Sequence, residues 1–335
     1  MHILNIEIFG ITFRVETDSP YVYEHLSKDF FLYKKKITSD AKSLVSLTTL
    51  HQLPPFDRVP AVEDSLHSFG FITYKDKNVH YTAYSSEGLL IYDFTKEKIE
   101  IFGEDDFFIY EKTKLAVLSR LGQLSDRQRL HRIHAFAVSL HNKSLLCILP
   151  MEGGKTTTVL NLLKKEPNLK IITDDVCFID PKGYIRPFLL RIGARDKALV
   201  EGIPAPFVDE IPRPYYGVKY FINPELFQKN LLEAPLPLNY ILIGKRTFRQ
   251  ETSIEKIFSL RCVPALLKNL MIAQDLPQLE EFFLRRDWPW VWQRLKAYAS
   301  RFLLCIRLLL KTNFFIIKIG RNKKSTCEEI LKLLK

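Results

Sequence analysis

Residues able to bind phosphate and a divalent cation stand in two short groups of this 335-residue chain. The groups are Gly153, Gly154, Lys155, Thr156 and Thr157 and, further along, Asp174 and Asp175. Glycine lets backbone N–H groups turn toward phosphate oxygens, lysine supplies a mobile cation, and a threonine hydroxyl is an oxygen ligand of the kind Mg²⁺ prefers. Paired aspartates can divide two tasks, since one can hold a metal ion while the other orients or deprotonates an attacking hydroxyl. The residue types therefore predict a site for nucleotide phosphates and Mg²⁺.

The sequence around these groups predicts the elements that would position them. Residues 145–149 have the composition of an apolar strand that enters a tight loop at 150–154, and the apolar residues along 159–163 have the spacing of a helix. A second apolar strand at 171–172 ends at the paired aspartates. Strand, glycine loop, Gly-Lys-Thr, helix, strand and acidic pair is the order of parts in a nucleotide-phosphate site, where the helix N-terminus adds positive charge.

Two residues of the loop depart from the usual phosphate-binding pattern. That pattern has a glycine six positions before the lysine, where this chain has Leu149. Glu152 places a carboxylate within the loop, where one like-charge contact at ~6 Å and an effective dielectric of ~20 costs roughly 3 kcal/mol. The sequence leaves three alternatives: Glu152 points outward, Mg²⁺ offsets its charge, or the loop no longer binds a triphosphate.

The wider segment resembles the catalytic domain of HPr kinase and its relatives, which share the core of phosphoenolpyruvate carboxykinases. That family places a histidine one strand ahead of the loop, and here His134 precedes Lys155 by 21 residues. The family follows its loop helix with a strand ending in Asp-Asp and then with a short hairpin, matched here by Asp174, Asp175 and residues 176–187. The resemblance covers roughly residues 130–270, with its motifs confined to 134–190.

The resemblance implies an α/β fold, α+β overall, in which an HPr kinase- and carboxykinase-like P-loop core with a mixed sheet follows a smaller N-terminal α+β module. It implies a kinase that uses ATP and Mg²⁺ to transfer a phosphoryl group to a hydroxyl, in the first place a serine of a protein or peptide. The implied catalytic residues are Asp174, Asp175 and His134. The implied nucleotide-binding residues are Gly153, Gly154, Lys155, Thr156 and Thr157, and the implied Mg²⁺ ligands are Thr156 and Asp175.

Some features separate the chain from HPr kinase itself. Leu149, Met151 and Glu152 stand where relatives usually carry Gly, Ser and Gly, and the Arg-Gly-rich signature of HPr kinases is absent downstream. A divergent relative is therefore expected. The alternative is a nucleotide-binding or degenerate, non-catalytic interaction protein with a basic docking tail. Carboxykinase-type decarboxylation lacks support, because the sequence shows no second lysine–histidine pair for a metal. The acceptor, the donor among ATP, GTP and pyrophosphate, and the oligomeric state stay open.

Length and composition limit the number of domains and the class of protein. The length predicts about two domains, and we place an N-terminal α+β module at 1–128 and the nucleotide-binding domain at 129–335. Hydrophobic residues make up 47% of the chain, which argues against disorder. Five scattered cysteines without C-x-x-C spacing, and a start without a basic leader, favour a reduced cytoplasmic protein.

Periodicity predicts further elements. Alternating apolar and polar residues predict the strands of an antiparallel α+β module at 3–8, 11–16, 71–74, 80–84 and 89–94. Helices are predicted from Ser19, at 106–128, at 258–273 and after a capping box at Ser325 to Glu328, and a strand is predicted at 313–319. The proline-rich residues 191–220 are predicted to form a long connection, which in compact domains often acts as a lid or binding loop.

The net charge of +11 is concentrated in the last part of the chain. Residues 284–335 hold 13 lysines and arginines against Asp287, Glu328 and Glu329, a surplus of 10. Residues 288–311 predict a long helix, interrupted by too many charges to span a membrane. Either this helix is solvated and packs its apolar side on the core, or it docks on an acidic protein or peptide, a nucleic acid or a membrane surface. No recognised nucleic-acid module accompanies the charge, which argues against nucleic acid.

Two further groups of residues have a structural and a functional interpretation. Cations that could meet phosphate, if the fold brings them to the loop, are Arg186, Arg191, Lys219, Lys245 and Arg246. The tryptophans at 288–292 are predicted to pack against the rest of the fold, and the alternative is that they bind in a groove of a partner protein.

Overall fold

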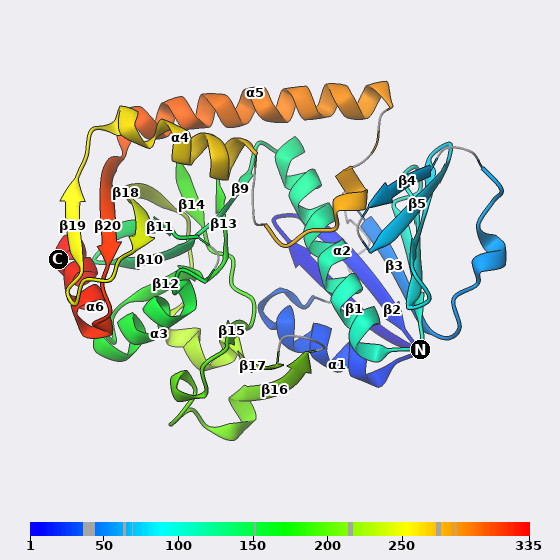
Figure 1. Ribbon diagram of the computed structural model, residues 1–335, viewed down its shortest axis with the longest axis horizontal. Helices are drawn as coiled ribbons and strands as arrows, with labels where there is room; N and C mark the ends of the chain where they lie inside the picture. The colour runs from blue at the N-terminus through cyan, green and yellow to red at the C-terminus, as the bar shows by residue number, and fades with distance from the viewer. Residues whose placement is uncertain are drawn as a thin grey trace. The chain divides into compact units, whose positions relative to one another are not determined.

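The computed structural model describes residues 1–35, 44–62, 65–68, 70–150, 152–213, 217–272, 276–283, 285 and 287–335. The chain forms two compact units, the first comprising Met1–Leu124 and Pro277–Asp287 and the second Ser125–Leu276 and Trp288–Lys335. Each unit combines helices with a large mixed sheet, so the fold is mixed α/β (Figure 1). Met151 of the loop and the end of the helix predicted at 258–273 lie outside the described residues.

The first unit is built on a mixed sheet. Its strands are β1 (His2–Ile8), β2 (Ile11–Thr17), β3 (Leu44–His51), β4 (Ser65–Ser68), β5 (Phe71–Asp76), β6 (Val79–Tyr84), β7 (Gly88–Asp93) and β8 (Lys98–Gly103). They lie in the order β1-β2-β3-β8-β7-β6-β5-β4. The antiparallel arrangement expected from the sequence is wrong at one strand, because β3 runs parallel to both β2 and β8. A parallel neighbour requires a crossover, which the segment containing α1 (Pro20–Asp29) provides between β2 and β3.

The helices of the first unit follow the sequence prediction closely. Ser19 caps α1, since its hydroxyl accepts a hydrogen bond from Val22 N at 3.2 Å. The helix predicted at 106–128 is α2 (Asp106–Arg127). The division between the units falls within this helix, after Leu124, and residues 277–287 return to the first unit.

The second unit holds a larger mixed sheet. Its strands are β9 (His131–His134), β10 (Phe136–Leu140), β11 (Lys143–Ile148), β12 (Lys170–Thr173), β13 (Val176–Ile179), β14 (Tyr184–Arg186), β18 (Leu236–Arg246), β19 (Ser253–Lys256) and β20 (Asn313–Ile319). The main order is β12-β10-β11-β18-β14-β13-β9, and off this path β20 pairs with β18 and β19. Strands β11, β18 and β20 run parallel, so their carboxyl ends meet at one edge. Strands β10 and β11 are joined by a turn at His141 and Asn142, with φ of 50° and 62° as a tight hairpin requires.

Helices cover both faces of this sheet (Figure 1). They are α3 (Lys155–Lys165), α4 (Val263–Leu266), α5 (Trp288–Lys311) and α6 (Lys323–Leu334). Leu266 of α4 and Leu304 and Leu308 of α5 join the buried cluster that includes Leu146 and Ile241 of the sheet. Helices α3 and α6 pack against each other on the opposite side.

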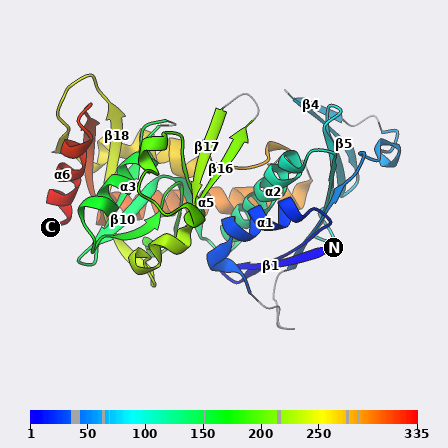
Figure 2. The same ribbon diagram turned by 90° about the horizontal axis from the view of Figure 1, so that it is seen from below.

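The proline-rich segment 191–220 differs from its prediction. It is not one long loop, because β15 (Ile192–Ala194), β16 (Val208–Arg213) and β17 (Gly217–Ile222) form a small antiparallel sheet in the order β15-β17-β16. Figure 2 shows β16 and β17 as a hairpin. Pro212 lies in β16, an outer strand of this sheet, where a residue without an N–H is tolerated.

Two helix predictions near the C-terminus need correction. The segment predicted as a helix at 258–273 is broken into a 3-10 turn at Ser259–Cys262, the short α4 and a π-helical turn at Leu267–Met271. The capping box at Ser325 is wrong. Helix α6 begins at Lys323, before the predicted start, because the Asn322 side chain caps it by accepting hydrogen bonds from Lys324 N and Ser325 N.

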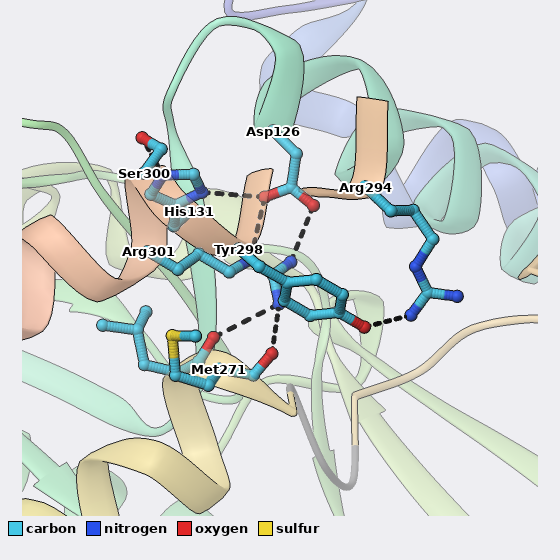
Figure 3. A network of polar contacts seen from close by, with 8 residues as sticks. Asp126, His131, Met271, Arg294, Tyr298, Ser300 and Arg301 are labelled. Atoms are coloured by element: carbon cyan, nitrogen blue, oxygen red, sulfur yellow. Dashed lines mark hydrogen bonds and ion pairs between the residues drawn. The ribbon is translucent and has the colours of Figure 1, made fainter. Parts of the chain in front are cut away.

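A buried polar network fixes α5 to its own unit (Figure 3). Arg301 donates to Asp126 Oδ2 at 2.6 Å and to the carbonyl oxygens of Leu270 and Met271 at 3.2 and 3.0 Å. His131 bridges Asp126 Oδ1 and Ser300 Oγ, at 2.8 Å from each. Burial disfavours the charge on Asp126, but the His131 hydrogen bond and the positive charge of Arg301 hold its pKa below the usual value.

Among the described residues, no helix is both long and apolar enough to cross a bilayer.

Candidate functional site

The loop at 150–154 joins the end of β11 to the start of α3, as the sequence predicts. Gly153 N donates to Pro150 O at 2.9 Å, and a Cβ on Gly153 would approach that oxygen to 2.8 Å, so only glycine fits. Gly154 caps α3 with φ of 91°, a left-handed conformation that glycine adopts without steric cost. The loop therefore turns tightly and leaves the first N–H groups of α3, with their partial positive charge, facing outward from the strand end.

Leu149 is part of the core and not of this turn. Its side chain is buried, and a Cβ on Gly244 of β18 would lie 2.1 Å from Leu149 Cδ2. Because Gly244 has no side chain, the bulky side chain of Leu149 fits against it. The first departure from the phosphate-binding pattern is explained by packing between neighbouring strands.

Lys155 begins α3 with its side chain folded over the loop. Its Nζ donates to Leu149 O at 3.2 Å and to Pro150 O at 3.3 Å, and the residue is buried. Both acceptors are neutral carbonyl oxygens, which stabilise an ammonium less than anionic oxygens do. The cation is therefore held at the loop by contacts that phosphate oxygens could replace.

The structure joins the two groups of predicted residues through Thr156 and Asp174. Thr156 Oγ1 donates to Asp174 Oδ2 at 2.9 Å. The other carboxylate oxygen, Oδ1, is buried and accepts no hydrogen bond within the described part of the chain. Burial raises the pKa of Asp174 to about 7, and the carboxylate of Asp175 adds to the rise. The Thr156 hydroxyl and the charges of Lys219 and Lys155 oppose it. A buried carboxyl group with one free oxygen and a near-neutral pKa is suited to binding a cation or exchanging a proton.

Asp175 and His134 meet beside Asp174. Strand β9 pairs with β13 so that His134 lies opposite Val176, and His134 Nδ1 is 3.3 Å from Asp175 Oδ1. Ala135 N donates to Asp175 O at 3.0 Å, which fixes the backbone between them. The Asp175 side chain is 53% exposed, against 7% for His134. The three residues predicted to be catalytic therefore lie together, and Asp175 is the one that solvent reaches.

Glu152 points toward a cation that the sequence did not identify. It forms an ion pair with Arg195, which follows β15, and both side chains are largely exposed. Glu152 has φ of 59°, the left-handed region that non-glycine residues seldom occupy. The carboxylate is thus paired at the surface, consistent with the outward-pointing alternative. No sequence signal links the two residues, because Arg195 lies 43 residues further on, after four more strands.

A cavity of about 470 Å³ opens beside the glycine loop. Its lining comes from Gly153, Gly154, Thr157, Thr158, Asn161, Arg246, Thr247, Phe248, Ile319, Gly320, Arg321, Lys323 and Thr326. It lies where the parallel strands β18 and β20 end and where α3 and α6 begin. Ligands of open α/β sheets bind at such carboxyl ends, at points where helix N-termini favour anions.

The cavity is basic and has an exposed aromatic side chain at its rim. Arg246 Nη2 would lie 3.4 Å from a Cβ on Gly154, so this guanidinium stands beside the loop. The Arg321 guanidinium lies over the Phe248 ring, 5.6 Å from its centroid, and Phe248 is 90% exposed. Lys323 approaches Asp196 to 3.8 Å. Arg246 was among the sequence candidates, whereas Arg321, Lys323 and Phe248 were not, because each lies far from the motif in the sequence.

The other candidate cations have different surroundings. Arg191 is buried and pairs with Asp209 at 2.8 Å, and Arg186 approaches Asp180 to 3.7 Å. Lys219 passes over Gly193, where a Cβ would meet Lys219 Cε at 2.3 Å, and its charge acts on Asp174. Lys219 therefore joins the electrostatic surroundings of the acidic pair, while Arg186 and Arg191 have structural partners.

Three more observations complete the site. Within the described ranges, no group of three or more His, Cys, Asp or Glu side chains is arranged to hold a metal. The five cysteines, Cys147, Cys177, Cys262, Cys305 and Cys327, are buried and unpaired.

No protein-family model and no curated protein sequence matches the chain.

Proposed function

We propose that this protein is a divergent HPr kinase-like enzyme that transfers the terminal phosphoryl group of ATP to a hydroxyl. The observation that carries the proposal is the 2.9 Å hydrogen bond from Thr156 Oγ1 to Asp174 Oδ2. It links the helix that follows the glycine loop to the acidic pair at the neighbouring strand end. The loop of a phosphate site and the carboxylates of a transfer site thus form one constellation, as phosphoryl transfer requires.

The positive charge around the loop supports binding of a polyphosphate. Lys155 would exchange the carbonyls of Leu149 and Pro150 for phosphate oxygens, and Arg246 stands beside Gly154. The basic cavity beyond Arg246 has room for the rest of a nucleotide, and the exposed Phe248 ring offers a face on which a base can stack. These features favour a nucleoside triphosphate over inorganic phosphate.

The residues present fit Mg²⁺. The Thr156 hydroxyl and the Asp174 carboxylate are hard oxygen donors, and Asp174 Oδ1 is buried without a hydrogen-bond partner among the described residues. The pair Thr156 and Asp174 is therefore our proposed metal site, in place of the Thr156 and Asp175 pair expected from the sequence. When bound, Mg²⁺ would neutralise charge on the phosphate oxygens.

Asp175 is the proposed general base. Its carboxylate is exposed enough to meet an acceptor hydroxyl, and His134 lies 3.3 Å from Oδ1, where it can orient the group. The acceptor oxygen forms a bond to the γ-phosphorus, the bond from that phosphorus to the β–γ bridging oxygen breaks, and the acceptor proton passes to Asp175. ADP then leaves with the bridging oxygen. A serine of a protein or peptide as the acceptor rests on the resemblance alone.

The direct test combines binding and turnover. Calorimetric titration of ATP with Mg²⁺ and with chelator measures binding, and ATP labelled at the γ-phosphate reports transfer to water, to the chain itself or to serine peptides. We expect Mg²⁺-dependent binding and slow release of labelled phosphate. Binding without any transfer would favour the non-catalytic nucleotide-binding alternative. Absence of binding at millimolar ATP would refute both.

Glu152 gives a prediction in which two substitutions act in opposite directions. Glu152→Gly removes a carboxylate near the phosphates and also a left-handed non-glycine residue, so ATP should bind about two- to tenfold more tightly. The gain should be larger with chelator, when no cation offsets the repulsion. Arg195→Gln leaves Glu152 without its partner and should weaken ATP binding. If both substitutions leave the dissociation constant unchanged, the loop does not contact phosphate.

Arg246 tests the assignment of the cavity. Arg246→Ala should raise the dissociation constant for MgATP about tenfold, because one charge-assisted contact to phosphate is lost. Arg249→Ala is the matched control, since Arg249 is an exposed arginine just beyond the residues that line the cavity. Equal effects of the two substitutions would mean that only net charge matters and would exclude a nucleotide in this cavity.

A further inference from the structure

Helix α5 buries only one narrow face. Its buried residues are Arg301, Leu304, Cys305 and Leu308, which recur at helical spacing. Arg301 and its neighbour Ser300 are held by the polar network of Asp126 and His131 (Figure 3). The rotation of the helix about its own axis is therefore fixed by hydrogen bonds as well as by packing, and the face opposite Leu304 points to solvent.

The opposite face is apolar along the whole 24-residue helix. We call it the apolar stripe, and its members are Trp288, Trp292, Leu295, Leu303, Ile306 and Leu310. They recur at steps of three or four residues, with the exposed Ala299 between Leu295 and Leu303. Leu310 is 80% exposed, Trp288 75% and Leu303 66%. Side chains of this size, so exposed and so aligned, mark an interaction surface.

The charge along α5 is of one sign. Residues 288–311 contain no Asp or Glu. Lys296, Arg307 and Lys311 follow the apolar stripe along one side, and no carboxylate pairs with any of them in the described structure. The segment that packs against α5 adds exposed Phe258, Leu260 and Ile272. An apolar face flanked by cations alone complements a surface that is apolar beneath and anionic above.

We infer that α5 is a docking helix for a membrane surface rich in anionic lipid, lying in the plane of the interface. Charge complementarity selects this occupant. A second copy that covered the apolar stripe with its own α5 would bring like charges together, because this helix carries no acidic residue. Tryptophan favours the boundary between headgroups and acyl chains, and Trp288 and Trp292 lie at one end of the stripe. The inference is independent of the proposed kinase activity.

The composition of the chain provides a specific probe. Its three tryptophans, Trp288, Trp290 and Trp292, all lie in the first turns of α5. Intrinsic tryptophan fluorescence of the full chain therefore reports on this helix alone. Phosphatidylcholine vesicles that contain phosphatidylglycerol should shift the emission to shorter wavelength at low salt, and pure phosphatidylcholine vesicles should do so much less.

Matched variants distinguish binding through the apolar stripe from nonspecific hydrophobic binding. The double substitution Leu303→Ser and Leu310→Ser should weaken vesicle binding about tenfold or more, because both side chains insert into the interface. Leu53→Ser, which removes an equally exposed leucine of the first unit, should have no effect. Since all these side chains are exposed, thermal unfolding should be unchanged in each variant.

A second set of variants tests the charges. Substituting Lys296, Arg307 and Lys311 with glutamine should weaken binding to phosphatidylglycerol vesicles by ~10- to 100-fold and reduce its salt dependence. The control substitutes glutamine for Lys77, Lys96 and Lys98, which removes the same charge from the first unit. Equal losses in both sets would overturn the inference.

Other results would also overturn it. One is the absence of an emission shift with anionic vesicles at low salt. A second is a concentration-dependent dimer that the Leu303 and Leu310 substitutions abolish, which would assign the apolar stripe to a second copy. A third is binding to polyglutamate but not to vesicles, which would assign α5 to an acidic protein.

Discussion

Replacing Lys155 with methionine should abolish phosphoryl transfer and leave the fold in place. The ammonium group donates hydrogen bonds to Leu149 O and Pro150 O at 3.2 and 3.3 Å, both within the same loop. Loss of these bonds should cost about 1–2 kcal/mol of the free energy of unfolding. Loss of the cation that meets the transferring phosphate should lower kcat/KM by roughly 1,000-fold, since transfer depends on charge neutralisation and positioning.

A lysine at the other end of the same helix provides the control. Lys165→Met removes an equal charge from the last turn of α3, where Lys165 pairs with Glu328 at 2.6 Å. Its transfer rate and ATP affinity should match the wild type. Circular dichroism and thermal unfolding check that both variants fold. Retention of ATP binding and turnover by Lys155→Met would contradict the assignment of 150–154 as a phosphate loop.

Asp174→Asn should inactivate the protein and stabilise it at the same time. Well below pH 3.8 the carboxyl group is protonated in both the folded and the unfolded chain, so it has no effect on stability. As the pH rises from its usual pKa of 3.8 to the folded value of about 7, the unfolded chain ionises first, and the free energy of unfolding falls. The loss approaches about 1.4 kcal/mol per pH unit and totals on the order of 2–4 kcal/mol above pH 7.

Asparagine does not titrate, so the variant should be more stable than the wild type at pH 8, and the difference should become small as the pH falls below 3.8. Chemical denaturation across this range measures the difference. Glu281 is buried, and burial raises its pKa to about 7 as well, but it is present in both proteins and cancels. Equal stability of wild type and variant at pH 8 would show that Asp174 is not held in its neutral form.

The same substitution should lower transfer by at least ~100-fold, because the residue left at position 174 cannot supply an anionic oxygen. In the wild type, transfer should rise as the pH increases through about 7, since Asp174 must lose its proton to hold a cation. Asp175→Asn should also reduce transfer by ~100-fold but leave Mg²⁺ dependence unchanged, as expected of a general base. Near-full activity in both variants would exclude the acidic pair from catalysis.

The sequence alone predicted the elements whose signals lie within a few neighbouring residues. The helix after Gly154, the strand at Asn313–Ile319 and the cap at Ser19 were all predicted, because each has a local signature in residue type and spacing. The long helix at Trp288–Lys311 also appeared from periodicity alone. Side-chain spacing and capping chemistry act over a few residues, so these elements can be predicted without knowing what they pack against.

Prediction failed where pairing joins distant residues. The parallel placement of β3 between β2 and β8 and the small sheet within 191–220 depend on strand partners that no local pattern specifies. Leu149 departed from the loop pattern in the sequence, and only the adjacency of β18 showed that Gly244 makes room for it.

The sequence predicted which residues the fold brings together at the candidate site, but not which of them contact one another. Spacing alone could not say whether Thr156 meets Asp174 or Asp175, because a strand end presents two successive side chains to different sides. Strand β12 pairs with β10 and β13 pairs with β9. In this arrangement Asp174 lies against Thr156, and Asp175 lies beside His134. The partner of Glu152, the cations of the cavity and the outward direction of the apolar stripe were likewise decided by tertiary structure. Each depends on long-range contacts, which the fold forms at little additional entropic cost once the strands have paired.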